Sequence, residues 1–264
     1  MDRLLTTSDA AEKAGVGPTA IKRWADEGLL PCVRTAGGHR RFEEAALAAF
    51  LKGQATRSEQ GSDAERFVDR LLDAESGQQV EAQLLVLRGR EGAWQRVAPL
   101  LGGVFVEIGA RWEKGELSLI EEHVVSERLL RAITRISEAI PVAPQAPLAL
   151  LAAVEGDDHV LGLSTVELCL REAGFRTRWA GRAAPLEEVV GFIQGDVVDM
   201  LAVSASSAST DAKKLKRYAL RVAEVCEAHE VKLLLGGSGA WPSAPRYGIR
   251  LCSFEELNAF LAAG

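Results

Sequence analysis

With 264 residues, 47% of them hydrophobic and 26% charged, the chain has the composition of a soluble globular protein and is long enough for two or three domains. The formal net charge of -6 at pH 7 excludes a uniformly basic nucleic-acid coat, so any contact with DNA must come from a local basic patch. The four cysteines lie far apart without a CxxC pair, and no apolar run approaches membrane-spanning length, so we expect reduced thiols in a cytoplasmic protein without a membrane partner.

The first predicted elements are two short helices joined by a tight turn. Thr7 or Ser8 can cap a helix that runs to Ala14, and the turn Gly15-Val16-Gly17 follows it. A second helix is predicted over Pro18–Glu27, because proline is tolerated in a first helical turn and Gly28 is a natural stop. The core side of this helix carries Ile21 and Trp24, and the side that can enter a major groove carries Thr19, Lys22 and Arg23.

A basic segment without any acidic residue follows, from Leu29 to Phe42. The pair Gly37-Gly38 suits the tip of a two-stranded wing, and Phe42 can close this hairpin onto the helices. The candidate DNA-binding residues of the wing are Arg34, Thr35, His39, Arg40 and Arg41.

The helix-turn-helix over Ser8–Asp26 and the wing over Arg34–Phe42 resemble the MerR family of regulators across about fifty residues. The resemblance implies a winged helix-turn-helix domain over residues 1–55 that binds double-stranded operator DNA. The alternative is a small helical module for protein interaction with a solvated run of charges. His39 could also bind a metal, but no second histidine or cysteine pair lies near it, so a phosphate contact is the simpler interpretation.

A helical bundle is predicted next. The polar stretch Gln54–Ser62 reads as a linker, and from Asp63 to about Ile140 apolar residues recur at intervals of three and four. This periodicity predicts about four helices, and we place a bundle domain over residues 62–140.

A doubly wound α/β domain is predicted over residues 147–264. Pro141, Pro144 and Pro147 form a second linker that cannot continue a helix. Beyond it, apolar runs of strand length alternate with amphipathic stretches, which is typical of a parallel sheet. The predicted strands are Leu148–Val154, Met200–Val203 and Val231–Leu235, and the predicted helices are Val160–Ala173 and Asp211–Ala228.

The loop after the first strand, Glu155–Gly162, carries a candidate metal ligand. Ligands of such sheets bind at the carboxyl ends of the strands, where His159 is placed. Asp157 can hold one ring N–H of His159 and leave the other nitrogen for a metal, and Gly162 lets a large planar ligand approach. The alternative is a loop histidine that simply binds the neighbouring carboxylate.

The spacing of Asp157, His159 and Gly162 resembles the cobalt-binding loop of cobalamin domains. The resemblance implies a Rossmann-like cobalamin-binding domain in which His159 is the lower axial ligand of cobalt. Three further residues after predicted strands match family positions that line the nucleotide-tail pocket, namely Ser204, Gly236 and Gly237. The chain departs from the family at Ser206, where leucine is usual, so we expect a more polar tail pocket.

The bundle resembles the light-sensing cobalamin regulators of the CarH and LitR type, because nine residues separate Trp112 from the pair Glu122-His123. The resemblance implies that these three residues lie over the upper face of the corrin and enclose an adenosyl group. The chain departs from these relatives at Glu113, where they carry a histidine that can bind cobalt after photolysis. His123 and His229, which is predicted at the exposed end of a helix, are not obvious replacements.

Together these resemblances predict a non-enzymatic regulator without catalytic residues. The leading hypothesis is a light-responsive repressor that binds operator DNA as a dimer or tetramer when adenosylcobalamin is bound, because linking several small DNA heads multiplies their affinity. The alternatives are a light-independent sensor of cobalamin or another tetrapyrrole, a regulator with a degenerate pocket, and a corrinoid methyltransferase or mutase component. An enzyme would need a partner subunit, because no substrate-binding barrel fits in the remaining chain.

Overall fold

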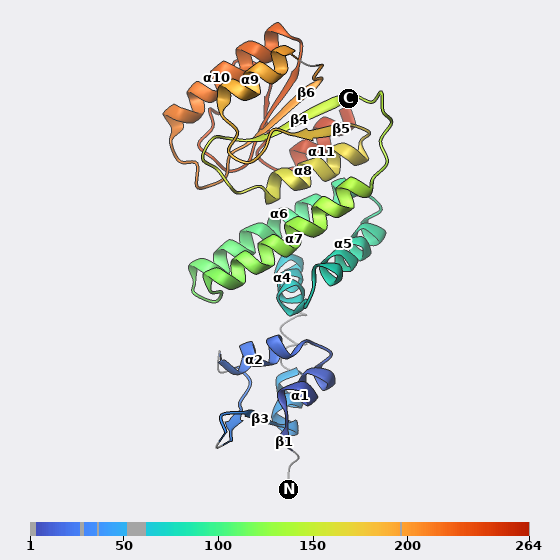
Figure 1. The fold of residues 1–264 in the computed structure, drawn as a ribbon, viewed down its shortest axis with the longest axis vertical. Coiled ribbons are helices and arrows are strands. Elements are labelled where there is room, and N and C mark those ends of the chain that lie inside the picture. The colour runs from blue at the N-terminus through green and yellow to red at the C-terminus, as the bar shows by residue number, and fades with distance from the viewer. Residues whose placement is uncertain (1–3, 27–28, 36, 52–61, 196, 264) are drawn as a thin grey trace. The chain divides into compact units, whose positions relative to one another are not determined.

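The structure is a computed structural model, and it describes residues 4–26, 29–35, 37–51, 62–195 and 197–263 (Figure 1). Its internal contacts divide the chain into two compact units. Unit one comprises residues 1–82 and 106–128, and unit two comprises residues 83–105 and 129–264. No helix in the described part of the chain combines the length and the apolar character needed to cross a membrane.

Unit one begins with a winged helix-turn-helix. Helices α1 (Thr7–Ala14) and α2 (Pro18–Asp26) pack with a three-stranded antiparallel sheet in the order β1-β3-β2. Its strands are β1 (Leu4–Leu5), β2 (Val33–Arg34) and β3 (Arg40–Glu43), and residues 44–51 are again helical. A core of buried apolar side chains holds this domain together and includes Ile21, Trp24 and Phe42.

Two details of this domain concern the sequence predictions. The cap of α1 is Thr6 and not Thr7 or Ser8, because the extended backbone of Thr6 lets its hydroxyl accept from Asp9 N while the Asp9 carboxylate accepts from Thr6 N. The predicted end of the second helix at Glu27 and Gly28 lies outside the described residues. The wing turn is confirmed, since Gly38 N donates to Thr35 O at 2.8 Å and Thr35 N donates to His39 O at 2.9 Å.

Four helices follow, as the apolar periodicity predicts. They are α4 (Asp63–Asp73), α5 (Gly77–Glu91), α6 (Trp94–Glu113) and α7 (Leu119–Ala139). Ser62 caps α4 through a reciprocal pair of hydrogen bonds with Glu65. The rest of the predicted linker, residues 54–61, lies outside the described residues.

The remainder of unit two is a parallel five-stranded sheet in the order β5-β4-β6-β7-β8. Its strands are β4 (Leu148–Ala153), β5 (Arg176–Trp179), β6 (Met200–Ser204), β7 (Lys232–Gly236) and β8 (Ile249–Arg250). Its helices are α8 (Leu161–Glu172), α9 (Leu186–Gly195), α10 (Ala212–Ala228) and α11 (Phe254–Ala263).

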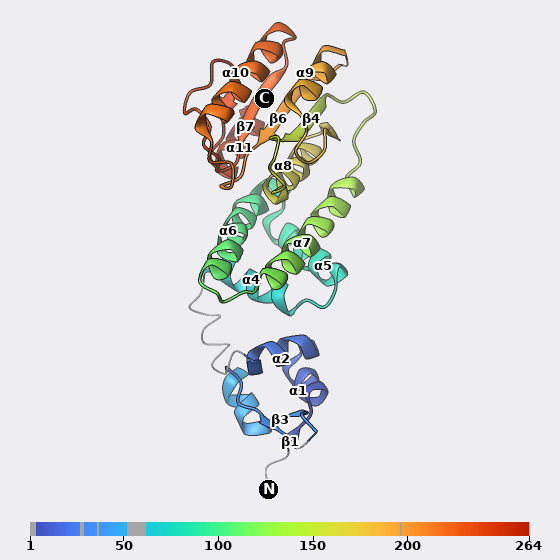
Figure 2. The same ribbon diagram turned by 60° about the vertical axis from the view of Figure 1, so that its left-hand side comes forward.

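Helices cover both faces of this sheet (Figures 1 and 2). Alternate strand residues such as Leu150, Leu201 and Leu233 pack with α9 and α10, while Leu151 and Ala202 pack with α8 and α11. Burial on both faces explains why β4, β6 and β7 are continuous apolar runs in the sequence. The predicted doubly wound fold is therefore confirmed.

Candidate functional site

The candidate ligand site lies at the carboxyl edge of the parallel sheet. From β4 the chain crosses to β5 on one side and then returns to β6 on the other side, so the strand order reverses between β4 and β6. Loops on either side of such a reversal diverge and leave a crevice for ligands. The loop after β4 carries Asp157 and His159, and the loop after β6 carries Ser206 and Ser209.

His159 is held by Asp157 and points its ring to the exterior. Its Nδ1 lies 3.2 Å from Asp157 Oδ1, and its backbone N donates to the same oxygen at 3.0 Å. The His159 side chain is 71% exposed, whereas that of Asp157 is 1% exposed. The bond at Nδ1 favours the tautomer in which Nε2 carries the lone pair, which is the form that binds a metal.

Asp157 accepts hydrogen bonds from both loops. Besides the bonds from His159, it accepts from Ser206 N at 2.6 Å, from Ser206 Oγ at 3.0 Å and from Ser209 Oγ at 2.7 Å. Burial by itself would raise the pKa of this carboxyl group, but the hydrogen bonds from Ser206, Ser209 and His159 outweigh burial and lower the pKa. Asp157 is therefore a buried anion that ties the histidine loop to the next loop.

Ser209 was missed by the sequence analysis, and Ser206 has a different environment from the one we expected. The Ser206 hydroxyl donates to Asp157 and accepts from Ala208 N at 3.2 Å. We expected this hydroxyl to make a tail pocket more polar, but its hydrogen bonds are made to Asp157 and Ala208. The only signal in the sequence was the density of serines after β6, which does not reveal a partner 49 or 52 residues away.

The three candidate glycines differ in how much space surrounds their backbone. A Cβ added at Gly162 would meet no atom within 4 Å, and one added at Gly236 would meet only Val203 O at 3.9 Å, so a ligand could approach the backbone at both places. At Gly237, where φ is +84°, a Cβ would lie 2.2 Å from Ala205 O, so the fold itself requires glycine. Ser204 lies at the end of β6 and is 9% exposed.

The residues expected on the upper face of a corrin belong to unit one, at the ends of α6 and α7. Trp112 is 47% exposed although it is a large aromatic residue. Glu122 accepts from Ser126 Oγ at 2.7 Å, and its Oε2 lies 3.5 Å from Nε2 of the exposed His123. Glu113, the residue after Trp112, is also exposed.

Arg111, next to Trp112, fixes the end of α6 within unit one. It donates to Asp69 Oδ1 and Glu107 Oε1, both at 2.6 Å, and to Glu65 O at 3.2 Å. Burial by itself would lower the pKa of Arg111, but Asp69 and Glu107 raise it above the ordinary value. Arg111 therefore remains charged and holds Trp112 on a helix end with a defined position, a role that the sequence did not indicate.

The candidate DNA contacts lie on α2 and the wing. Thr19 and Lys22 are exposed on α2, opposite the buried Ile21 and Trp24. The side chain of Arg23 is not among those that the structure describes. The wing residues Arg34, Thr35 and His39 are exposed, and Arg40 and Arg41 are partly buried on β3. The Arg41 guanidinium donates to Arg40 O at 3.0 Å.

The DNA-binding head and the chain as a whole are both similar to known proteins. Residues 4–55 match the helix-turn-helix domain family. The "HTH-type transcriptional repressor CarH" of Myxococcus xanthus is 26% identical over 245 residues, covering 78% of this chain and 81% of the relative. The chain resembles the CarH-type repressors. This likeness extends well beyond the DNA-binding head.

Two corrinoid proteins are also similar to the chain. "Dimethylamine corrinoid protein 3" of Methanosarcina mazei is 26% identical over 143 residues, covering 51% of this chain and 81% of the relative. The monomethylamine corrinoid protein of Methanosarcina barkeri has a solved structure with a TM-score of 0.54 and 20% identity, covering 75% of this chain and 97% of that one. The structural likeness supports the bundle and α/β fold.

Proposed function

We propose that the chain is a cobalamin-dependent transcriptional regulator that represses its target as an oligomer on operator DNA. The observation that carries this proposal is the combination of two sites in one chain. A winged helix-turn-helix precedes an α/β domain whose exposed His159 is oriented by a buried aspartate at the point where the strand order reverses. The similarity to a repressor and to corrinoid proteins supports the same combination.

In this proposal His159 Nε2 would hold the cobalt of cobalamin, and Asp157 would keep the ring in the tautomer that this requires. The open backbone at Gly162 and Gly236 supports the approach of a large ligand. We assign Ser204, Gly236 and Gly237 to the nucleotide tail. We assign the upper ligand, adenosyl, to Trp112, Glu122 and His123. When bound, cobalamin would supply a cobalt–carbon bond that green light can break.

The proposal is tested by the visible absorption spectrum of the purified chain with added adenosylcobalamin. We expect stable binding with the spectrum of a histidine-ligated corrinoid, and His159→Ala should lose this spectrum and bind at least about tenfold more weakly. His229→Ala is the matched control, because His229 is an exposed histidine at the end of α10. Equal spectra for the parent and His159→Ala would refute ligation from below.

Light sensing is tested on the same sample. The oligomeric size and the retardation of promoter DNA are compared in the dark and after green illumination. We expect illumination to change both, because loss of the upper ligand removes the group that Trp112, Glu122 and His123 are proposed to enclose. Identical results before and after illumination would exclude a photoreceptor.

One observation favours a second candidate, a light-independent sensor of cobalamin or another tetrapyrrole. The exposed residue after Trp112 is Glu113, and a carboxylate does not provide the imidazole that the light-sensing relatives offer to cobalt at this position. A spectrum that reports a bound tetrapyrrole, combined with light-insensitive DNA binding, would select this candidate.

A further inference from the structure

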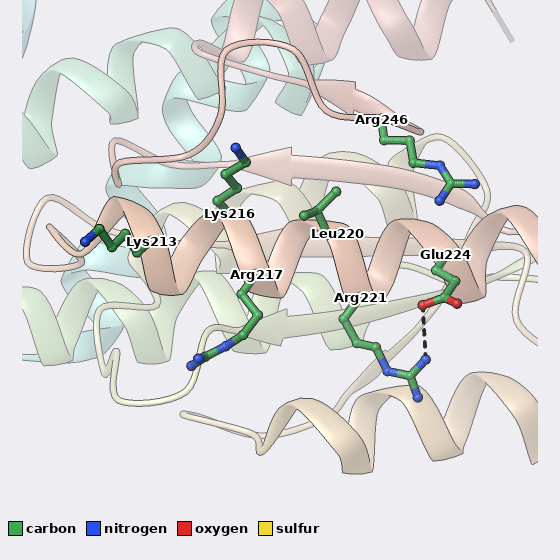
Figure 3. A pocket seen from close by; sticks show the side chains of 7 residues that line it. All are labelled: Lys213, Lys216, Arg217, Leu220, Arg221, Glu224 and Arg246. Carbon is green, nitrogen blue, oxygen red and sulfur yellow. Dashed lines mark hydrogen bonds and ion pairs between the residues drawn. The ribbon is translucent and has the colours of Figure 1, made fainter.

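A shallow basic groove lies on the outer side of α10 and is lined by residues other than those of the candidate site (Figure 3). Lys213, Lys216, Arg217 and Arg221 line it from α10, and Arg246 lines it from the segment between β7 and β8. Leu220, which is 47% exposed, lies between the charged side chains. The groove thus gathers five cations in a chain whose net charge is -6.

Acidic neighbours neutralise only one end of the groove. Arg221 lies 3.3 Å from Glu187 Oε2 and 3.4 Å from Glu224 Oε2. Arg246 lies 2.9 Å from Glu227 Oε2. At the other end, Lys213, Lys216 and Arg217 have no ion-pair partner among the described residues. In the view of Figure 3, which looks onto this groove, Lys216 extends above α10 and Arg217 extends below it, so the two cations flank the exposed face of the helix.

These three cations lie near the N-terminus of α10, which does not favour positive charge in its first turn. They fall in the first two turns of α10 (Ala212–Ala228), and no acidic residue lies in the first turn. The N-terminus of a helix carries partial positive charge that acts within the first turn, so Lys213 lowers the stability of α10 there, and the N-cap Asp211 offsets it. The helix dipole therefore does not favour Lys213, and no ion pair within the described residues holds Lys216 or Arg217, so all three exposed cations are available to a polyanion.

We propose that the face formed by Lys213, Lys216 and Arg217 is a second, sequence-independent contact for the phosphates of duplex DNA. This inference rests on the proposed DNA-binding function and adds a surface to it outside the winged helix-turn-helix. Lys213 and Arg217 are about 6 Å apart along the axis at 1.5 Å per residue. Each strand of B-DNA offers one phosphate per about 3.4 Å of axis, so the three side chains can reach successive phosphates.

The composition of the groove favours duplex DNA over other anionic partners. Lysine is depleted in protein–protein interfaces, and two of the three unpaired cations are lysines. Single-stranded nucleic acid is usually held by aromatic side chains that stack on bases, and the described residues that line this groove include no aromatic one. Long, flexible cations without aromatic neighbours are typical of contacts with a duplex backbone.

The test is the salt dependence of binding of the full chain to a random-sequence 40-base-pair duplex, followed by fluorescence anisotropy between 50 and 200 mM KCl. Each lost phosphate contact lowers the slope of log K against log salt by about 0.9. The triple variant Lys213→Gln, Lys216→Gln, Arg217→Gln should therefore give a slope shallower by about 2 to 3. Arg90→Gln, Arg182→Gln, Lys232→Gln is the matched control, because it removes three exposed cations elsewhere in unit two.

The outcomes separate this inference from the proposed function. A shallower slope for the α10 variant and an unchanged slope for the control support it. If the α10 variant binds like the parent while Arg40→Ala, Arg41→Ala binds more weakly, the second contact is wrong and the DNA-binding head stands. If the parent does not bind DNA, both proposals fail. If the α10 variant changes the oligomeric size and not the slope, the groove contacts a second copy and the DNA contact is refuted.

Discussion

Asp157 shows how one buried side chain links two loops that are distant in the sequence. The residue is 2% exposed, but it retains its charge because backbone and hydroxyl groups of Ser206 and Ser209 donate to it together with His159. A buried carboxylate is stable only when such donors satisfy it. Its hydrogen bonds therefore position His159 and also hold the loop after β4 against the loop after β6.

Asp157→Asn should lower both stability and cofactor affinity. The asparagine amide keeps one acceptor oxygen, but its NH2 group would face groups that donate hydrogen bonds to Asp157. We therefore expect a loss of about 1 to 3 kcal/mol in the free energy of unfolding. Removal of such an outer partner typically weakens metal binding by about 10- to 100-fold. Urea unfolding and a spectroscopic titration with adenosylcobalamin measure the two effects. An unchanged free energy of unfolding together with an unchanged cofactor affinity would contradict this role. Asp158→Asn is the control, because Asp158 is an exposed neighbour.

The same carboxylate makes stability depend on pH. Because the pKa of Asp157 is lower in the folded than in the unfolded chain, its ionised form stabilises the fold above the ordinary aspartate pKa, and this contribution is lost as pH falls through the lowered pKa. Acid titration of the unfolding free energy should therefore show a smaller fall for Asp157→Asn than for the parent. Parallel curves for the two proteins would show that Asp157 does not contribute to the pH dependence of stability.

At the scale of elements, Glu172 of α8 joins helices within unit two. Its Oε2 accepts from Trp94 N at 2.6 Å and from Gln95 N at 3.3 Å, so it caps the first turn of α6. Its Oε1 accepts from Arg88 Nε of α5 at 2.9 Å. A carboxylate at a helix N-terminus satisfies unpaired amides and interacts favourably with the helix dipole. Glu172 thereby fixes the start of α6 on the α/β domain.

Glu172→Ala should destabilise unit two. Loss of a capping group costs about 0.5 to 2 kcal/mol, and the partly buried Arg88 also loses its partner, so we expect a total near the upper end of that range. Chemical unfolding followed by circular dichroism measures the change. Glu138→Ala, which removes an exposed glutamate from α7, should have little effect, and an equal loss for the two variants would contradict the capping role.

At the scale of the whole molecule, the DNA-binding head has its own core. Leu5, Ile21, Trp24, Phe42 and Leu47 are all buried in one apolar cluster of that domain. The sheet of unit two has separate clusters on its two faces. Independent cores imply that a substitution in the head leaves the α/β domain folded.

Arg40→Ala, Arg41→Ala should therefore weaken DNA binding without changing the cobalamin spectrum. Loss of two phosphate contacts reduces the salt slope by about 2 and lowers affinity by at least about tenfold at physiological salt. Anisotropy with duplex DNA and the visible spectrum of the same sample report the two properties. A changed spectrum would show that the two domains do not behave independently.

The sequence alone determined the features that depend on local pattern. Glycines and basic residues predicted the wing, and apolar spacing predicted four helices and the strands β4, β6 and β7, because periodicity and turn residues act over a few positions. The short edge strands β5 and β8 were not predicted, since β5 is rich in arginine and β8 has only two residues. Their pairing depends on neighbouring strands more than on their own composition.

Only the tertiary structure decided how the candidate site is supported. The sequence could place Asp157 beside His159, because two residues separate them, but it could not show that Ser206 and Ser209 donate to the same carboxylate from another loop. It likewise could not show that Arg111 is held by Asp69, or that three cations on α10 lack acidic partners within the described part of the chain. These contacts join residues far apart in the chain, and sheet order and helix packing determine which of them meet.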